Sequence, residues 1–338
     1  MKPLVLVYGL GNFGYALLKH LDRYRTNDYR IAAFDRDPAV MRRLRRYRQH
    51  TRINPTHYIS PAFILPQTAA ELFPQADIII LAVTSQSIPE IIDQFNGYAH
   101  SKKPILLINS AKALATESGE RLEVVIARSF RHAYRYAYLA GGTIAEDLYN
   151  SYPLGATIAS TSRVAAREAK HLLAAPTFRL YPTSDVAGAE YCAAFKNVVS
   201  IFAGIVAGLG WPYGSETYFI SRFSREVERF VIKELKGRPT TFSMDSQCWG
   251  NDLWMSCTGK TRNRAFGVLL GKGASVRQAL LRMPKGKRTV EGLTTLSVLP
   301  RLCADCTKYP FLSTMIDIVV NGKKPAVAIE RLMTDPSI

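Results

Sequence analysis

Cysteine is scarce in this chain. Its five residues among 338 are an odd number and show no disulfide framework. Cys303 and Cys306 have CxxC spacing, but no second pair of ligands lies near them, and the six histidines form no metal-ligand pattern. We therefore favour two ordinary helix thiols over a zinc or redox site, and we expect no bound metal.

Long apolar runs are also missing. The longest run without charge, residues 198–211, is too short to cross a bilayer and predicts a buried helix. The first apolar run after Met1 and Lys2 is too short for a signal sequence and leads into a turn. We expect a cytoplasmic protein without membrane insertion.

Acidic residues are outnumbered, with 27 Asp and Glu against 44 Lys and Arg, which gives a formal charge of +17. Such a charge can serve nucleic-acid binding. The chain nevertheless has no aromatic-interleaved RNA-binding motif, zinc finger or long basic tail. Its densest basic run, residues 42–48, suits a solvated helix face. We favour that interpretation and expect no nucleic-acid partner.

Short, almost wholly apolar segments recur through the first half of the chain. They predict strands at residues 4–8, 29–34, 76–83, 104–109, 136–140, 155–159 and 178–181. Buried strands separated by helical segments indicate a mainly parallel sheet covered on both faces. This half therefore predicts a doubly wound α/β domain of the Rossmann type.

The pattern changes near residue 186, where the strands stop. The clearest helices beyond it are predicted at residues 186–210, 215–235, 264–270 and 290–308. A chain of this length suits two domains. We predict a dinucleotide-binding domain at residues 1–186 and an all-helical substrate and catalytic domain at residues 187–338.

A glycine fingerprint follows the first strand. Gly9, Gly11 and Gly14 have the spacing GxGxxG and lead directly into a helix. The first glycine permits a tight turn, the second lets backbone amides approach a pyrophosphate, and the third lets the helix pack on the strand. In this context, the motif predicts a dinucleotide site at the positive end of the helix.

The end of the second strand bears on the choice of dinucleotide. Asp35 lies about twenty residues beyond the glycines, where a carboxylate can bind the adenosine ribose hydroxyls and repel a 2′-phosphate. Arg36 has the opposite tendency, because its guanidinium could hold that phosphate. Asp35 could also be a simple turn residue. We favour NAD and leave NADP open.

Small polar groups follow several later strands. Ser85 lies after the third strand, Lys112 after the fourth, and residues 141–145 after the fifth. Ligands of open α/β sheets bind beyond the carboxyl ends of the strands. These segments therefore predict one crevice, although each could be a plain loop.

The second half supplies a lysine and an anion clamp. Lys196 lies in an apolar helix, where burial and a second cation disfavour its charged form, as suits a proton donor. Arg262-Asn263 stands at a predicted helix start, where an arginine fork and free amides can hold phosphate. On spacing alone, these could equally be solvated side chains. With the glycine fingerprint, they suggest a dehydrogenase acting on a phosphorylated alcohol.

At this point the chain resembles a known family, the bacterial biosynthetic type of NAD(P)-dependent glycerol-3-phosphate dehydrogenase. The resemblance covers nearly the whole chain, from Leu4 to Met333, and its motifs keep their order. They lie at residues 183–190, 193–198, 203–205, 252–253, 256–258, 262–264, 271–273, 290–292 and 322–333.

The resemblance implies reversible hydride transfer between NAD(P)H and dihydroxyacetone phosphate, giving sn-glycerol 3-phosphate for phospholipid synthesis, in an enzyme that is usually a homodimer. It implies that Lys196 is the general acid and base, with Lys112 and Asp252 beside it. The substrate-site positions that it implies are Lys112, Gly141, Thr143, Asp252, Thr261, Arg262 and Asn263. Those near the cofactor are Asn12, Phe13, Arg36, Lys112, Ala145, Arg262, Val290 and Glu291.

Several positions depart from the family pattern. Gly142 and Ile144 replace a usual Pro and Phe, Asp35 is at a position that is seldom acidic, and Trp249 replaces part of a Gly-rich approach to Asp252. One alternative is therefore a related dehydrogenase for another phosphorylated hydroxy-ketone or a hydroxy acid. Another is a non-catalytic sensor that binds the dinucleotide.

Overall fold

Seven strands of the first half form one sheet in a computed structural model of the protein, which describes residues 2–54, 56–99, 103–284 and 288–335. The strand order is β2-β1-β3-β4-β5-β6-β7, and all neighbouring pairs are parallel except β5 and β6. This confirms the predicted doubly wound, mainly parallel sheet. The strands are β1 (Leu4–Tyr8), β2 (Arg30–Phe34), β3 (Ile78–Leu81), β4 (Ile105–Asn109), β5 (Tyr134–Ala140), β6 (Leu154–Ala159) and β7 (Phe178–Thr183).

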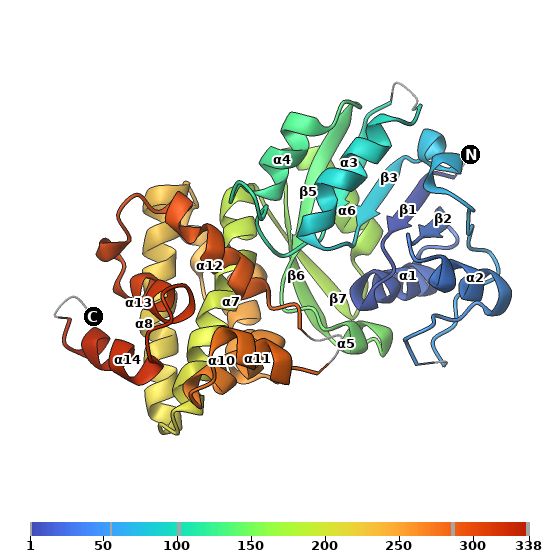
Figure 1. Cartoon of the computed structure of the whole chain (residues 1–338). Coiled ribbons are helices and arrows are strands. Elements are labelled where there is room, and N and C mark those ends of the chain that lie inside the picture. Colours follow the sequence, from blue (N-terminus) through green and yellow to red (C-terminus); the bar gives the residue numbers. More distant parts are fainter. Residues whose placement is uncertain (1, 55, 100–102, 285–287, 336–338) are drawn as a thin grey trace. The chain divides into compact units, whose positions relative to one another are not determined.

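Alternate residues of the strands enter two different cores. In β1, Val5 and Val7 belong to one core, and Leu4, Leu6 and Tyr8 belong to the other. The first core is covered by α1 (Asn12–Tyr24), α2 (Pro38–Tyr47), α5 (Ala145–Tyr149) and α6 (Arg163–Leu173) (Figure 1). The second is covered by α3 (Ile88–Asn96), α4 (Leu122–Ser129) and the 3-10 turns η1 (Ala69–Glu71) and η2 (Phe73–Gln75).

The chain divides into two structural units. The first comprises Met1–Ala111 and Leu122–Val186, and the second comprises Lys112–Arg121 and Ala187–Ile338. Residues 112–121 therefore belong with the helices and not, as the sequence suggested, with the sheet. Gly119, at a positive φ of 75°, turns this segment against Val298 of the helical unit.

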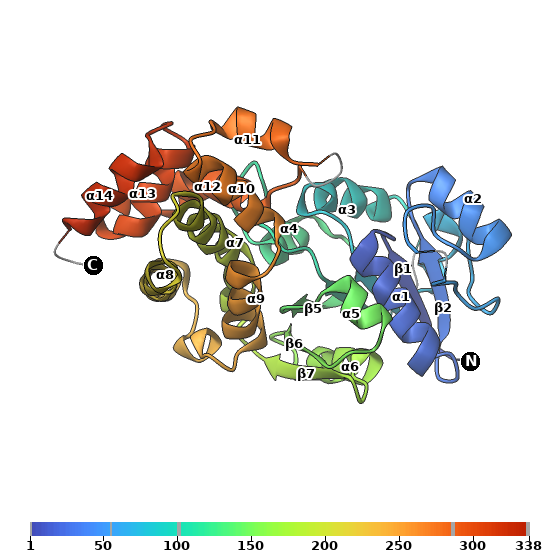
Figure 2. The same ribbon diagram turned by 90° about the horizontal axis from the view of Figure 1, so that it is seen from below.

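Beyond residue 186, the described part of the second unit consists of helices and the loops between them (Figure 2). The helices are α7 (Val186–Gly208), α8 (Tyr213–Leu235), η4 (Pro239–Phe242), a π-helix η5 (Gln247–Asn251), α9 (Asp252–Thr258), α10 (Arg262–Gly271), α11 (Val276–Arg282), α12 (Glu291–Leu302), η6 (Cys306–Lys308), α13 (Pro310–Val319) and α14 (Pro325–Met333).

The core of this unit is built around α7. The helix has 23 residues and is long and apolar enough to cross a membrane, but 89% of its apolar window is buried. Phe202 of α7 contacts Phe219 and Phe223 of α8 and Phe311 of α13, with ring centroids 5.4 to 5.6 Å apart. The length and apolar character of α7 therefore fit a core helix.

Several predicted helix boundaries differ from the observed ones, and two of the differences have a clear local cause. The helix predicted at residues 290–308 ends at Leu302, because Cys303 has an extended backbone. A separate 3-10 helix begins at Cys306. Cys303 and Cys306 are therefore not on one helix. Neither thiol forms a disulfide. Helix α10 begins at Arg262 and not at Arg264, since Thr261 accepts the capping hydrogen bond from the Arg264 amide.

Glycines bring α7 and α10 into backbone contact. A Cβ at Gly204 would collide with the carbonyl of Arg264, and one at Gly267 would collide with the carbonyl of Ile201. Gly208 and Gly271 repeat this contact one turn further along. The crossing fixes the position of the start of α10 relative to the middle of α7.

Candidate active site

A buried ionic cluster occupies the helical unit. Lys196 of α7 is only 5% exposed, and its Nζ donates to Asp252 Oδ1 at 2.6 Å and to Ser256 Oγ at 3.0 Å. The other Asp252 oxygen, Oδ2, lies 3.5 Å from Lys112 Nζ, and the Asp252 side chain is fully buried. The structure thus brings together all three residues predicted to be catalytic.

Helix spacing produces this cluster. Lys196 and Ser200 are one turn apart on α7, and Asp252 and Ser256 are one turn apart on α9. Ser200 Oγ donates to the Ser256 carbonyl at 2.6 Å, while Ser256 Oγ accepts from Lys196. The sequence prediction did not include Ser200 or Ser256 among the site residues, although their i, i+4 spacing from the charged pair was a usable signal.

Burial and charge oppose each other here. Burial alone would raise the pKa of Asp252, but the ammonium groups of Lys112 and Lys196 outweigh it and hold that pKa below the usual range. Burial also lowers the pKa of Lys112, an effect that Asp252 partly offsets. Asp252 therefore stays ionised at neutral pH, and Lys112 releases its proton more readily than an exposed lysine.

A second polar group lies at the start of α10. Arg262 Nη2 donates to Glu291 Oε1 at 2.6 Å, and Asn263 Nδ2 donates to Asn197 Oδ1 at 2.9 Å and to Glu291 Oε2 at 3.4 Å. Asn263 Oδ1 accepts from the Gly292 amide at 3.0 Å. Asn197 follows Lys196 directly, so these contacts join the arginine group to the lysine cluster.

The remaining predicted residues of this unit adjoin the same group. Thr261 caps α10 and donates its hydroxyl to the Ser256 carbonyl at 2.8 Å. Val290 and Glu291 are the N-cap and first residue of α12. Thus Thr261, Arg262, Asn263, Val290 and Glu291, which are separated in the sequence, lie on two adjoining helix starts.

The glycine turn of the first unit fits a dinucleotide. Gly9 has a φ of 92°, and a Cβ there would lie 2.7 Å from the Ala82 carbonyl oxygen, so the turn requires glycine. A Cβ at Gly14 would collide with the Gly9 carbonyl, whereas one at Gly11 would have no heavy atom within 4 Å. The open side at Gly11 is where a pyrophosphate could approach.

The start of α1 offers donors for such a group. Asn12 and Phe13 open the helix, its N-cap Gly11 has no side chain to satisfy the first amides, and the first turn has no acidic residue. Asp35 follows β2 and accepts the Leu10 amide at 2.6 Å. The open amides and the lack of an acidic residue in the first turn are the features that an anion-binding helix start requires.

Other predicted residues of this unit follow strand ends. Gly141 and Thr143 lie in the turn between β5 and α5, where the Thr143 amide donates to the Gly141 carbonyl at 2.7 Å, and Ala145 is the first residue of α5. Ser85 opens the 3-10 turn η3 (Ser85–Ser87) just after β3 and is buried. Arg36 adjoins Asp35 and pairs with Glu90 of α3.

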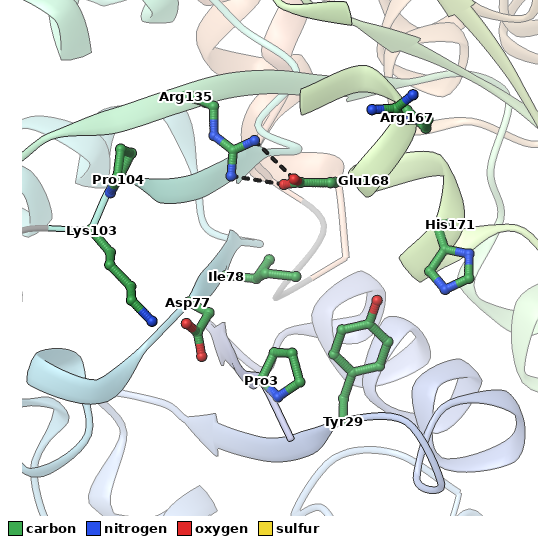
Figure 3. Close-up of a pocket in the computed structure, with 10 residues that line it drawn as sticks. All are labelled: Pro3, Tyr29, Asp77, Ile78, Lys103, Pro104, Arg135, Arg167, Glu168 and His171. Atoms are coloured by element: carbon green, nitrogen blue, oxygen red, sulfur yellow. Dashed lines mark hydrogen bonds and ion pairs between the residues drawn. The ribbon is translucent and has the colours of Figure 1, made fainter. Parts of the chain in front are cut away.

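A cavity of about 570 Å³ lies elsewhere in the first unit (Figure 3). It is at the amino ends of the strands, near Ile78 of β3 and Arg135 of β5, and Arg135 forms a two-bond ion pair with Glu168 of α6. The ten residues drawn around it include none of the predicted site residues. The cavity is therefore distinct from the strand edge at which the glycine turn lies.

One departure noted in the sequence concerns the core. Trp249 is buried in the π-helix, where its ring meets that of Phe242 at 5.1 Å with a T-shaped geometry. The Trp249 side chain is therefore part of the core.

Of the described residues, no group of three His, Cys, Asp or Glu could hold a metal ion.

Comparison with known proteins gives two matching family profiles. They are NAD-dependent glycerol-3-phosphate dehydrogenase N-terminus, over residues 4–166, and C-terminus, over residues 185–330. A curated glycerol-3-phosphate dehydrogenase (NAD(P)+) of Syntrophomonas wolfei is 29% identical, over 98% of this chain and 94% of the relative. One of Haemophilus ducreyi is 30% identical, over 82% of this chain and 80% of the relative.

Solved structures share the fold. The glycerol-3-phosphate dehydrogenase of Coxiella burnetii aligns over 99% of both chains with a TM-score of 0.86 and 22% identity. That of Plasmodium falciparum aligns over 100% of this chain and 96% of the other, with a TM-score of 0.90 and 16% identity.

Proposed function

Because the chain belongs to the NAD-dependent glycerol-3-phosphate dehydrogenase family, we propose that it reversibly reduces dihydroxyacetone phosphate to sn-glycerol 3-phosphate. The observation that carries this proposal is the Lys196–Asp252–Lys112 cluster, in which two amines share one fully buried carboxylate. Such an arrangement holds a proton donor in a fixed position, as ketone reduction needs.

Residues of the first unit would hold the cofactor. Gly9, Gly11 and Gly14, with the free amides of Asn12 and Phe13, would bind its pyrophosphate at the start of α1. The bound cofactor supplies or accepts the hydride. The chain's own residues have to bind the ketone and manage its charge and its proton.

Lys196 would give a proton to the oxygen that becomes negative in ketone reduction, and would take it back in the reverse direction. Asp252 accepts from its ammonium at 2.6 Å and Ser256 at 3.0 Å, so Nζ is held in one orientation with a third donor position left for the substrate. Lys112, whose side chain is 23% exposed, would polarise the ketone oxygen.

Arg262 and Asn263 would bind the substrate phosphate. The guanidinium is oriented by Glu291 through one nitrogen, which leaves its other donors for phosphate oxygens. Asn263 and the first amides of α10 would add uncharged donors at a positive helix end. These contacts to the phosphate, at a distance from the reacting carbon, would then orient the ketone toward Lys196.

Purified protein should oxidise NADH or NADPH when dihydroxyacetone phosphate is added, and not in its absence. Unphosphorylated dihydroxyacetone tests the role of the phosphate and should react far more slowly. Turnover of another phosphorylated hydroxy-ketone in preference to dihydroxyacetone phosphate would point to the related dehydrogenase. Dinucleotide binding without turnover of any ketone would point to the sensor.

We also propose a cytoplasmic homodimer whose product serves phospholipid synthesis. The support is the family membership of the chain. Light scattering of the purified protein tests the dimer, because a monomer would have half the mass. Loss of glycerol 3-phosphate in cells lacking the protein tests the cellular role.

A further inference from the structure

Asp35 connects two turns of the first unit. Its Oδ2 accepts the amide of Leu10, inside the glycine turn, at 2.6 Å, and its Oδ1 accepts the amide of Asp37 at 2.8 Å. Asp37 in turn caps α2 by accepting from the Ala39 amide at 2.9 Å. The carboxylate is thereby fixed against the loop that would hold the pyrophosphate.

This carboxylate still has acceptor capacity. An ionised carboxylate has about four acceptor positions, and two are used by the Leu10 and Asp37 amides. The hydroxyls of an adenosine ribose can donate to the others. A 2′-phosphate has a charge of about −2 and would instead bring like charges together.

Two arginines near this turn are paired with carboxylates. Arg36 Nη1 lies 3.3 Å from Glu90 Oε2, and Arg52 Nη2 lies 2.7 Å from Asp37 Oδ2. Asp35 and the two pairs together comprise three carboxylates and two guanidinium groups, and the four arginines of α2 follow on the helix that Asp37 caps. Arg36, which could otherwise hold a 2′-phosphate, is drawn toward Glu90.

We propose that Asp35 makes this protein select NAD(H) over NADP(H), and that Glu90 strengthens the selection by holding Arg36. The proposal rests on the function proposed above only in assuming that the glycine turn binds a dinucleotide. In this proposal, the negative charge of Asp35 beside the glycine turn repels the 2′-phosphate of NADP(H).

Binding of NADH and of NADPH, measured separately by titration calorimetry without a ketone at about 0.15 M salt, tests the proposal. NADH should bind at least about tenfold more tightly to the wild-type protein, because repulsion between close charges reaches this order. In Asp35→Asn, the ratio of the two dissociation constants should fall by at least about fivefold, even if both ligands bind more weakly. Equal or tighter binding of NADPH by the wild type, or an unchanged ratio in Asp35→Asn, would overturn it.

Glu90→Gln tests the second part and leaves the contacts of Asp35 in place. Arg36 and Glu90 are 67% and 75% exposed, so this variant should fold and should bind NADPH about two- to fivefold more tightly, with NADH unaffected. Glu168→Gln is the matched control, since it removes the same charge and also breaks an Arg–Glu pair, at Arg135. An effect in Glu90→Gln no larger than that in Glu168→Gln would exclude a role for Glu90.

These measurements separate the two proposals. If NADH binds selectively but no ketone is reduced, the selectivity assignment stands and the proposed reaction fails. If dihydroxyacetone phosphate is reduced but NADPH binds as tightly as NADH, the reaction stands and the role of Asp35 fails.

Discussion

At the residue scale, the helical unit depends on how two lysines share Asp252. Removing Asp252 would leave two ammonium groups close together, whereas removing one lysine leaves a carboxylate that still has an ionic partner. A change at Lys196 therefore tests chemistry with less risk to folding than a change at Asp252.

We expect Lys196→Met to reduce turnover by about 10³-fold or more, because the proton donor is lost while the volume is nearly kept. NADH affinity should change little. Steady-state kinetics and calorimetry measure the two effects. Lys233→Met, which removes an exposed lysine of α8, is the control and should keep full activity. Comparable activity in the two variants would remove Lys196 from its role.

Arg262→Ala should raise the KM for dihydroxyacetone phosphate by about 100-fold, since a charge-assisted phosphate contact is lost. The KM for the dinucleotide should rise much less. The control is Lys260→Ala, which removes the same charge from an exposed side chain two residues away. An equal rise in both Michaelis constants would show that Arg262 does not discriminate the substrate phosphate.

At the element scale, the crossing of α7 and α10 positions the site. Gly204, Gly208, Gly267 and Gly271 let the two backbones touch, so Lys196 and Arg262 are held by the same helix pair. A methyl group at this contact cannot be absorbed by a side-chain movement, because it meets a backbone carbonyl.

Gly267→Ala should therefore lower the free energy of unfolding by about 1–3 kcal/mol, and should reduce turnover as α10 shifts. Urea unfolding and kinetics measure these effects. Gly214→Ala in the first turn of α8, where a Cβ would meet no heavy atom within 4 Å, should be neutral or slightly stabilising. If Gly267→Ala had the same free energy of unfolding as Gly214→Ala, the close backbone contact between α7 and α10 at Gly267 would be contradicted.

The sequence predicts the elements of this fold better than their ends. Strands such as β3 and β4 were predicted because parallel strands buried on both faces are wholly apolar. The break after Leu302 was missed because no glycine marks it, and the start of α10 was misplaced because the capping role of Thr261 was not recognised.

Contacts between distant segments were the hardest to predict. The residues that form the cluster could be named from the family resemblance, but the pairing of Lys196 with Ser256 depends on how α7 meets α9. Residues 112–121 were assigned to the wrong unit, since their few apolar positions do not indicate which core they join. Local patterns specify elements, whereas tertiary packing decides such contacts.

At the scale of the whole molecule, each unit contains a buried group whose shifted pKa makes it titrate between about pH 4 and pH 7. In the first, burial lowers the pKa of His20 from 6.5 to about 4, although its Nε2 bonds the Leu173 carbonyl at 2.7 Å. In the second, burial raises the pKa of Glu226 from 4.5 to about 7, although it accepts the Phe311 and Leu312 amides at the start of α13.

The two shifts make stability depend on pH in opposite directions. The His20 contribution is fully present above pH 6.5, the unfolded value, and is lost as the pH falls toward about 4. The Glu226 contribution is fully present below pH 4.5 and is lost as the pH rises toward about 7. Each is on the order of 3 kcal/mol, so between pH 4.5 and 6.5 they largely cancel.

Single substitutions should therefore expose the opposite slopes. In Glu226→Gln, the free energy of unfolding should fall more steeply on acidification from pH 6.5 to 4.5 than in the wild type, because only the His20 effect remains in that range. In His20→Gln, it should instead rise on acidification. Urea unfolding at several pH values measures both slopes, and the double variant is the control. Parallel slopes in the two single variants would show that neither group titrates as its burial implies.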